Sequence, residues 1–348
     1  MSLMTLDPQS THMYREAEEA ADRIAAQLAA NAQAVGALAR RLRETPPRFV
    51  VTCARGSSDH AATFAKYVFE TELGFPTASA SPSVSSVYAS PLRLEGALFV
   101  AISQSGKSPD LVRNAERARD AGAHVVALVN VADSPLAAAA HDVIALHAGP
   151  ELSVAATKSY LCSLSAIVHI AAEWKGDATL RAALAGVPDA MRAAWRHDWA
   201  SLVDGLANAR NLFVLGRGLG LGAAQEAALK FKETSGLHAE GFSSAEVKHG
   251  PMALVGPDFP VLAFGQDDGT LAGTLAVADE FRKRGAHVWV AAPGDPVGAN
   301  LPLGAPMHPV CAPLVAVRQF YRAVNALAVR RGHNPDVPPH LNKVTETV

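Results

Sequence analysis

Residues 97–110 read ALFVAISQSGKSPD and combine three patterns in one short stretch. The apolar run 97–102 has the length and composition of a buried strand. A hydroxyl-rich turn, 103–108, follows it, and after Pro109 the apolar residues recur at helical spacing. The first turn of a helix has backbone N–H groups without partners and carries the positive end of the helix dipole. This stretch therefore predicts either an anion site or an ordinary helix cap.

The letters GKS at 106–108 resemble the end of a nucleotide-binding P-loop. That motif needs a glycine five positions before Gly106. Ala101 holds that position, so a triphosphate loop is excluded here.

The composition describes an ordinary globular chain. It has 348 residues, enough for two domains, with 49% apolar and 18% charged residues and a net charge of −2. There is no basic surplus to favour nucleic acid, no apolar run near the roughly 18 residues that span a bilayer, and no signal segment. The cysteines 53, 162 and 311 lie far apart in apolar surroundings without metal-ligand spacing, which predicts reduced core thiols. We expect a cytoplasmic protein that binds neither nucleic acid nor a membrane.

Predicted strands and helices alternate along the first half of the chain. We expect helices over 12–44, 61–73 and 159–174, and strands over 49–53, 77–80, 97–102, 125–129 and 143–146. This alternation predicts an α/β fold with a doubly wound parallel sheet and helices on both faces.

Several residues of this pattern recur in the second half of the chain at a nearly constant offset. Arg217 and Gly236 follow their counterparts, Arg55 and Gly74, by 162 residues, and the GAHV of 122–125 recurs 163 residues later. We therefore predict two copies of one α/β domain. We place an N-terminal helical segment at 1–45, the first copy at 46–190 and the second copy with a C-terminal tail at 191–348.

The two copies differ after the strand that corresponds to 97–102. The first copy has SQSGKS there, whereas the second has GQDD at 265–268. Two carboxylates would repel a phosphate, so we expect only the first copy to hold an anion. The second copy is richer in titratable residues, which suggests one composite site rather than two equal ones.

Those titratable residues begin with EAALKFKETSG at 226–236. On a helix Glu226, Lys230 and Glu233 share a face, either as a solvated salt-bridge row or as part of a site. Glu233 comes just before the expected helix stop at Gly236. The segment that follows reads as loop-rich and gathers several acids and bases up to His249, which is unusual for a surface loop without a function.

Three known motifs bear on this region of the second copy. The glycines of 218–223 fit a dinucleotide fingerprint, but a tight turn repeated from the first copy explains them more simply. The HAE of 238–240 is similar to the H-x-E motif of zinc deaminases, but the C-x-x-C that completes their zinc site does not follow anywhere in the sequence. A G-x-S-x-G nucleophile elbow is absent.

Six strings carry a family resemblance: SQSGKS at 103, ELSVAATKSY at 151, LGRGLG at 215, ALKFKETSGLHAE at 228, AEVKHGPMAL at 245 and LNKVTETV at 341. The two halves resemble tandem sugar isomerase (SIS) domains. The chain from about residue 48 is similar to the isomerase portion of glucosamine-6-phosphate synthase. Because the synthase's glutaminase domain has no counterpart in this sequence, the chain also resembles the stand-alone SIS-type glucosamine-6-phosphate deaminases.

The resemblance implies a role for individual residues. Glu233 would move the proton between C1 and C2 with Lys230 beside it, and His249 would assist ring opening from the neighbouring subunit. Lys343 would close over the sugar and can form a Schiff base with its keto form. The sugar phosphate would be bound by Ser103, Gln104, Ser105 and Ser108, with Ser57 and Ser58 close by.

The function that this resemblance implies is an amino-sugar phosphate isomerase and deaminase. It would convert glucosamine-6-phosphate to fructose-6-phosphate and ammonia without a metal or an organic cofactor, as a homodimer whose site is shared between subunits. Two alternatives stay open. One is the isomerase part of an aminotransferase-like enzyme that lacks the glutaminase domain, and the other is a non-catalytic protein that senses sugar phosphates.

Overall fold

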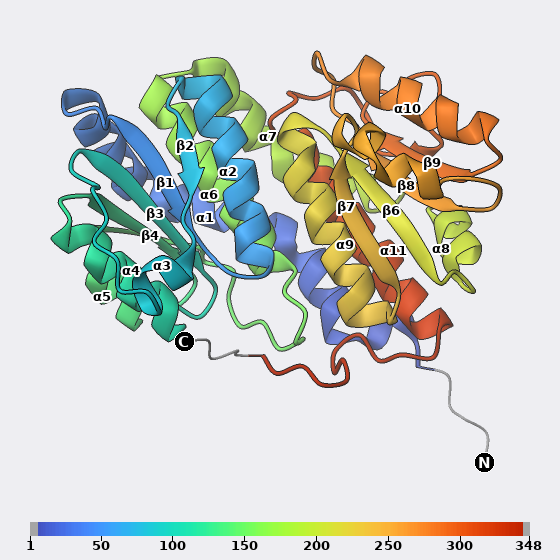
Figure 1. Ribbon diagram of the computed structural model, residues 1–348, viewed down its shortest axis with the longest axis horizontal. Coiled ribbons are helices and arrows are strands. Elements are labelled where there is room, and N and C mark those ends of the chain that lie inside the picture. The colour runs from blue at the N-terminus through green and yellow to red at the C-terminus, as the bar shows by residue number, and fades with distance from the viewer. Residues whose placement is uncertain (1–5, 344–348) are drawn as a thin grey trace. The chain divides into compact units, whose positions relative to one another are not determined.

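The computed structural model describes residues 6–343, which form two compact units (Figure 1). The first unit comprises residues 22–150 and 158–185, and the second comprises 6–21, 151–157 and 186–343. The chain passes from one unit to the other within α1 (His12–Glu44) and within α7 (Ala178–Ala194). The domain boundaries that the sequence suggests at 45 and 190 stay a prediction.

The first unit is built on a parallel five-stranded sheet. Its order is β2-β1-β3-β4-β5, and the strands are β1 (Phe49–Cys53), β2 (Thr77–Ser79), β3 (Ala97–Ser103), β4 (His124–Val129) and β5 (Asp142–Ala145). The seven residues of β3 are all buried, as a central strand covered on both faces requires. The predicted α/β class and parallel sheet are confirmed.

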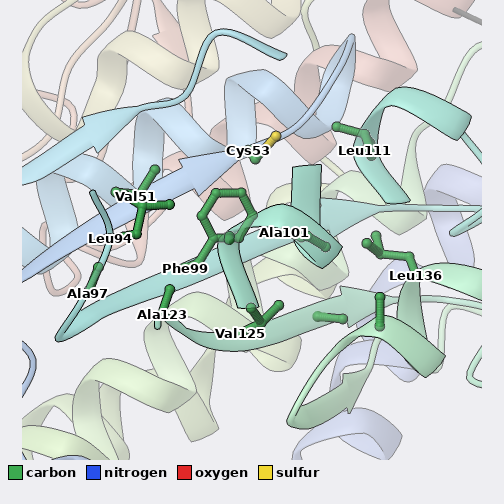
Figure 2. Close-up of a cluster of buried hydrophobic side chains, with 14 of the residues drawn as sticks. Val51, Cys53, Leu94, Ala97, Phe99, Ala101, Leu111, Ala123, Val125 and Leu136 are labelled. Atoms are coloured by element: carbon green, nitrogen blue, oxygen red, sulfur yellow. The ribbon is translucent and has the colours of Figure 1, made fainter. Parts of the chain in front are cut away.

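One face of this sheet packs against α4 (Pro109–Asp120) and α5 (Pro135–Ala139). Val51, Phe99 and Val125 stand opposite one another on β1, β3 and β4, and Figure 2 shows these side chains in one apolar cluster. Leu111 of α4 and Leu136 of α5 belong to the same cluster. Since β3 runs through the middle of this core, the turn at its carboxyl end is held in a fixed place.

The other helices of this unit agree with the sequence prediction, with one correction. The bounds of α1 are those expected, and α6 (Lys158–Lys175) extends the expected helix by one residue at each end. However, α2 begins at Ser57 rather than Ala61, so its range is Ser57–Leu73. Gly56 has a φ of 57° and allows the chain to turn directly from the strand into the helix. The short α3 (Pro82–Ser86) packs against α4, and α2 packs against α6.

The second unit repeats the same sheet. Its order is β10-β9-β8-β6-β7, which matches the first sheet strand for strand; the strands are β6 (Asn211–Gly216), β7 (His238–Ser243), β8 (Pro260–Phe264), β9 (His287–Ala292) and β10 (Leu301–Pro302). Its helices are α8 (Ala200–Leu206), α9 (Leu221–Ser235), α10 (Leu271–Lys283) and α11 (Ala312–Arg330), with 3-10 turns η1 (Pro8–Ser10), η2 (Gly218–Gly220), η3 (Glu246–His249) and η4 (Pro251–Leu254). The predicted duplication is thus visible in the topology.

One expectation for this unit is wrong. The segment after Gly236 is not loop-rich throughout, because 238–243 forms the edge strand β7 in register with β6. The sequence of this strand lacks a clear apolar pattern because the strand is only partly buried and carries polar residues. No helix within residues 6–343 is both long enough and apolar enough to cross a bilayer.

Candidate functional site

The first sheet has a topological switch point between β1 and β3. From β1 the chain leaves through α2 to β2 on one side, whereas β3 lies on the other side. In open α/β sheets the loops at the carboxyl ends of such strands diverge and leave a crevice that binds ligands. The loop 54–56 and the turn 104–108 follow these two strands. The fold therefore brings Ser57 and Ser58 to the same edge of the sheet as the serine-rich turn.

The turn after β3 is shaped by its own hydroxyls. Ser103 is 5% exposed, and its Oγ accepts a hydrogen bond of 3.0 Å from the Gly106 N–H. The Ser105 Oγ accepts one of 3.3 Å from Lys107 N–H. Ser108 is the N-cap of α4, yet its side chain makes no capping hydrogen bond. Ser103 thus holds the turn, while Ser105 and Ser108, together with Gln104, are partly exposed and able to meet a ligand.

Gly106 explains why this turn is so tight. Its φ is +63°, and a Cβ at this position would lie 2.1 Å from the Oγ of Ser134, the N-cap of α5. Only glycine fits both the backbone conformation and the space. Because α2 and α4 begin directly after the neighbouring strands β1 and β3, two positive helix ends lie at the same edge of the sheet.

The matching crevice of the second sheet is filled by the protein itself. Gln266 is 1% exposed, and its Nε2 donates to the Arg217 carbonyl at 2.7 Å and to the Thr270 Oγ1 at 2.8 Å. The Asp268 carboxylate accepts a hydrogen bond of 2.8 Å from Thr270 N–H. An amide and a carboxylate therefore stand in the second sheet where the first has its serine-rich turn, which favours an anion site in the first copy only.

A buried ionic cluster lies along α9 in the second unit. Lys230 has no exposed surface, and its Nζ lies 3.3 Å from the Glu226 Oε1 and 2.5 Å from the Glu233 Oε2. Glu226 is also fully buried and accepts a hydrogen bond of 2.8 Å from the Tyr321 hydroxyl of α11. Glu233 is 21% exposed, one turn before the left-handed Gly236 that ends the helix. The predicted shared helix face is thus an organised cluster rather than a solvated row.

The charges of this cluster determine what each group can do. Burial disfavours the Lys230 ammonium, but the carboxylates of Glu226 and Glu233 outweigh that effect and raise the pKa of Lys230. Both carboxylates therefore favour the ammonium form of Lys230. Of the two, Glu233 is the carboxylate that reaches solvent. This arrangement suits Glu233 as a base and Lys230 as an electrostatic partner.

The other two predicted catalytic residues lie elsewhere in the second unit. His249 is exposed at the end of η3, and it makes no hydrogen bond or ion pair with another residue of the described chain. Lys343 ends the described range. Its Nζ donates to the Ser153 carbonyl at 2.7 Å and to the Glu151 Oε2 at 3.2 Å, and the carboxylate of Glu151 is fully buried. The tail is thereby joined to the 151–157 segment.

Sequence reasoning missed several groups that organise these sites. Tyr321 and Glu226 are 95 residues apart in the sequence, and Lys343 and Glu151 are 192 apart. No short-range spacing in the sequence therefore predicts either pair. The i,i+4 spacing of Glu226 and Lys230 was the available signal, but it does not tell a buried pair from a solvated one. Within the described residues, no three His, Cys, Asp or Glu side chains form a group that could hold a metal.

Comparison with known proteins identifies the family of the chain. A family model described as the SIS domain matches residues 46–172 and 205–292. The glutamine–fructose-6-phosphate aminotransferase (isomerizing) of Methanothermobacter thermautotrophicus is 34% identical over 296 residues, which cover 83% of this chain and 50% of the relative. The chain thus spans about half the length of the curated relatives it matches.

Solved structures extend the comparison. A candidate phosphosugar isomerase from Silicibacter pomeroyi DSS-3 is 45% identical, with a TM-score of 0.88 over 94% of this chain and 100% of that one. A glucosamine-6-phosphate deaminase from Thermotoga maritima shares the fold at 19% identity, with a TM-score of 0.78 over 97% of this chain and 100% of that one. With both halves matched by the same family model and both sheets wound alike, the chain belongs to the SIS-domain family.

Proposed function

We propose that this protein is a phosphosugar isomerase and deaminase that converts glucosamine-6-phosphate to fructose-6-phosphate and ammonia. The observation that carries the proposal is the contact between the buried Lys230 ammonium and the partly exposed Glu233 carboxylate in a chain of the SIS family. A carboxylate held beside a fixed cation at a helix end is suited to moving a proton between neighbouring carbons.

The phosphate is bound at the crevice of the first sheet. The hydroxyls of Ser105 and Ser108 and the amide of Gln104 meet its oxygens, with Ser57 and Ser58 on the facing helix turn and Ser103 holding the shape of the turn. Binding energy from this group, which does not react, holds the open-chain sugar in place for the chemistry at C1 and C2.

The chemical step is a proton transfer followed by hydrolysis. Glu233 removes the C2 proton of the open-chain aldehyde, which gives an enolamine, and returns a proton to C1, which gives the C2 imine. Water then adds to the imine carbon and ammonia leaves, so that the ketone of fructose-6-phosphate remains. Lys230 stabilises the negative charge that develops on the C1 oxygen, and Glu226 keeps Lys230 protonated and in position.

Ring opening is assigned to His249, which would act in the site of a second copy. Its imidazole is exposed and is not engaged by other described groups, as a residue offered to a neighbouring subunit requires. The site is then complete only in a homodimer.

Lys343 is proposed to act as a cation that closes over the substrate. Its Nζ is held by the Glu151 carboxylate and the Ser153 carbonyl. The Glu151 carboxylate is fully buried, so the Nζ is tied to a group that solvent does not reach. A deaminase has no need of a lysine adduct, which agrees with this arrangement.

Ammonia is the nitrogen product that the proposed reaction releases at C2. A cysteine that attacked an amide such as glutamine would do so as its thiolate. Burial raises the pKa of Cys53 and that of Cys311 to about 12, and Cys162 is buried as well. None of these three thiols is therefore suited to that attack.

The test is a paired measurement of ammonia and fructose-6-phosphate from glucosamine-6-phosphate. Glu233→Gln should abolish both products while the phosphosugar still raises the melting temperature. Glu240→Gln, a change of an exposed glutamate on β7, is the matched control and should keep full activity.

Three other outcomes would each contradict the proposal. Intact turnover in Glu233→Gln would remove Glu233 from its role. Thermal stabilisation by the phosphosugar without product in the wild type would favour the sensor. Formation of glucosamine-6-phosphate from fructose-6-phosphate and ammonia, with no measurable reverse reaction, would favour the aminotransferase-like alternative.

A further inference from the structure

We propose that Arg55 is a further substrate-binding residue of this site, whose guanidinium contacts the substrate phosphate at the carboxyl edge of the first sheet. The proposal rests on the proposed function and adds to it a residue that none of the sequence motifs singled out as a ligand. It follows from an ion pair between the two loops that form the crevice.

The pair joins the loop after β1 to the helix after β3. The Nε and Nη2 of Arg55 each donate to the Asp110 Oδ2 at 2.8 Å. Asp110 lies in the first turn of α4, and its carboxylate has no exposed surface. Since the two residues follow the two strands of the switch point, the guanidinium is held at the carboxyl edge of the sheet, beside the start of α4.

This pairing leaves part of the guanidinium for a ligand. Both contacts use one oxygen of the Asp110 carboxylate, and the Arg55 side chain remains 45% exposed. Nη1 takes no part in either contact with Asp110. A guanidinium matches two phosphate oxygens with two parallel N–H donors, and an orienting carboxylate behind it limits the entropy lost on binding. A phosphate between the helix ends of α2 and α4 would meet this free edge.

The second sheet serves as an internal comparison. It retains an arginine, Arg217, at the position of Arg55, but Ala272 takes the place of Asp110 at the second residue of α10. There the Gln266 side chain fills the crevice. The second sheet therefore forms without a carboxylate at this position. The arginine–carboxylate pair occurs in the sheet with the serine-rich turn, which indicates a role other than building the fold.

A purely structural role for the pair must be separated from contact with substrate. Arg55→Ala alone would leave the buried Asp110 carboxylate without its cation and could unfold the unit. We therefore choose Arg55→Lys, which keeps the charge but loses the two-donor edge. The second variant is Arg55→Met with Asp110→Asn, which removes both charges together. Arg93→Ala, the loss of an exposed arginine in the same unit, is the control.

The experiment measures kcat and KM for glucosamine-6-phosphate, the inhibition constant of inorganic phosphate, and the urea midpoint of each variant. We expect KM and the phosphate inhibition constant to rise together by about tenfold or more in both Arg55 variants, the effect of losing one charged hydrogen bond to the ligand. The value of kcat should stay within about threefold, and the control should match the wild type.

Each other result overturns a defined part of the reasoning. A lowered urea midpoint with unchanged KM and phosphate inhibition would make Arg55 a link between loops and overturn the inference. A fall in kcat alone would overturn it too. If the wild type binds the phosphosugar without turnover, the proposed reaction fails, and the dissociation constants of the same variants test Arg55 directly. A wild type that binds neither phosphosugar nor phosphate overturns both.

Discussion

Replacing Lys230 by methionine should destabilise the second unit far more than its position on one helix suggests. Methionine has nearly the length of lysine, so the change leaves little empty space. What it removes is the cation 3.3 Å from the fully buried Glu226 carboxylate. At an effective dielectric constant of about 20, that attraction amounts to about 5 kcal/mol before the costs of burial. Breaking a buried pair by removing one partner typically costs about 3–5 kcal/mol, and we expect about 4 kcal/mol here.

Urea unfolding followed by tryptophan fluorescence measures this loss. Trp195, Trp199 and Trp289 lie in the second unit, so the signal reports mainly on the unit that contains the cluster. The double variant Lys230→Met with Glu226→Gln removes both buried charges, and it should recover at least half of the lost unfolding free energy.

An exposed pair with the same helical spacing provides the control. The Lys283 and Asp279 side chains on α10 are 75% and 57% exposed at an N–O distance of 2.7 Å. Lys283→Met should leave the urea midpoint unchanged within error, since solvent screens exposed pairs. A loss below about 1 kcal/mol in Lys230→Met, or a double variant as unstable as the single one, would refute the view that burial of Glu226 sets the cost.

Further measurements test the crevice, the tail and a buried histidine. Ser105→Ala should raise KM about tenfold with little change in kcat, and an unchanged KM would place the phosphate elsewhere. Gly106→Ala should lower the unfolding free energy by about 1–3 kcal/mol because of its positive φ and the close Ser134 Oγ, and an unchanged urea midpoint would contradict this. Borohydride added during turnover should leave Lys343 unmodified by mass spectrometry, and a reduced sugar adduct would show that it forms a Schiff base. Burial lowers the pKa of His169, so as the pH falls the unfolded chain takes up a proton at this residue before the folded chain does. The free energy of unfolding should therefore fall as the pH drops below about 6.5. His169→Gln should reduce this pH dependence of stability, and an unchanged pH dependence would show that His169 is not its source.

The repeat and the alternation of elements were readable from the sequence because both are local or periodic. Buried strands such as 97–102 are continuous apolar runs, and glycines such as Gly74 and Gly236 mark helix ends through a left-handed backbone, with φ of 75° and 57°. The nearly constant offset between the two copies then predicted two α/β units. The edge strand β7 was not predicted, because a half-exposed strand lacks the apolar pattern that identifies a central strand.

What the sequence determined by itself was therefore the fold class, the duplication and the chemical types of the candidate residues. Only the tertiary structure decided which charges are buried and with whom they pair. Asp110 meets Arg55 across 55 residues, and Glu226 meets Tyr321 across 95. Likewise, Gln266 fills one crevice while the serine-rich turn leaves the other open. Such pairs depend on which strands lie side by side, and it is burial in that arrangement that turns an ordinary charged residue into one that can hold a substrate or move a proton.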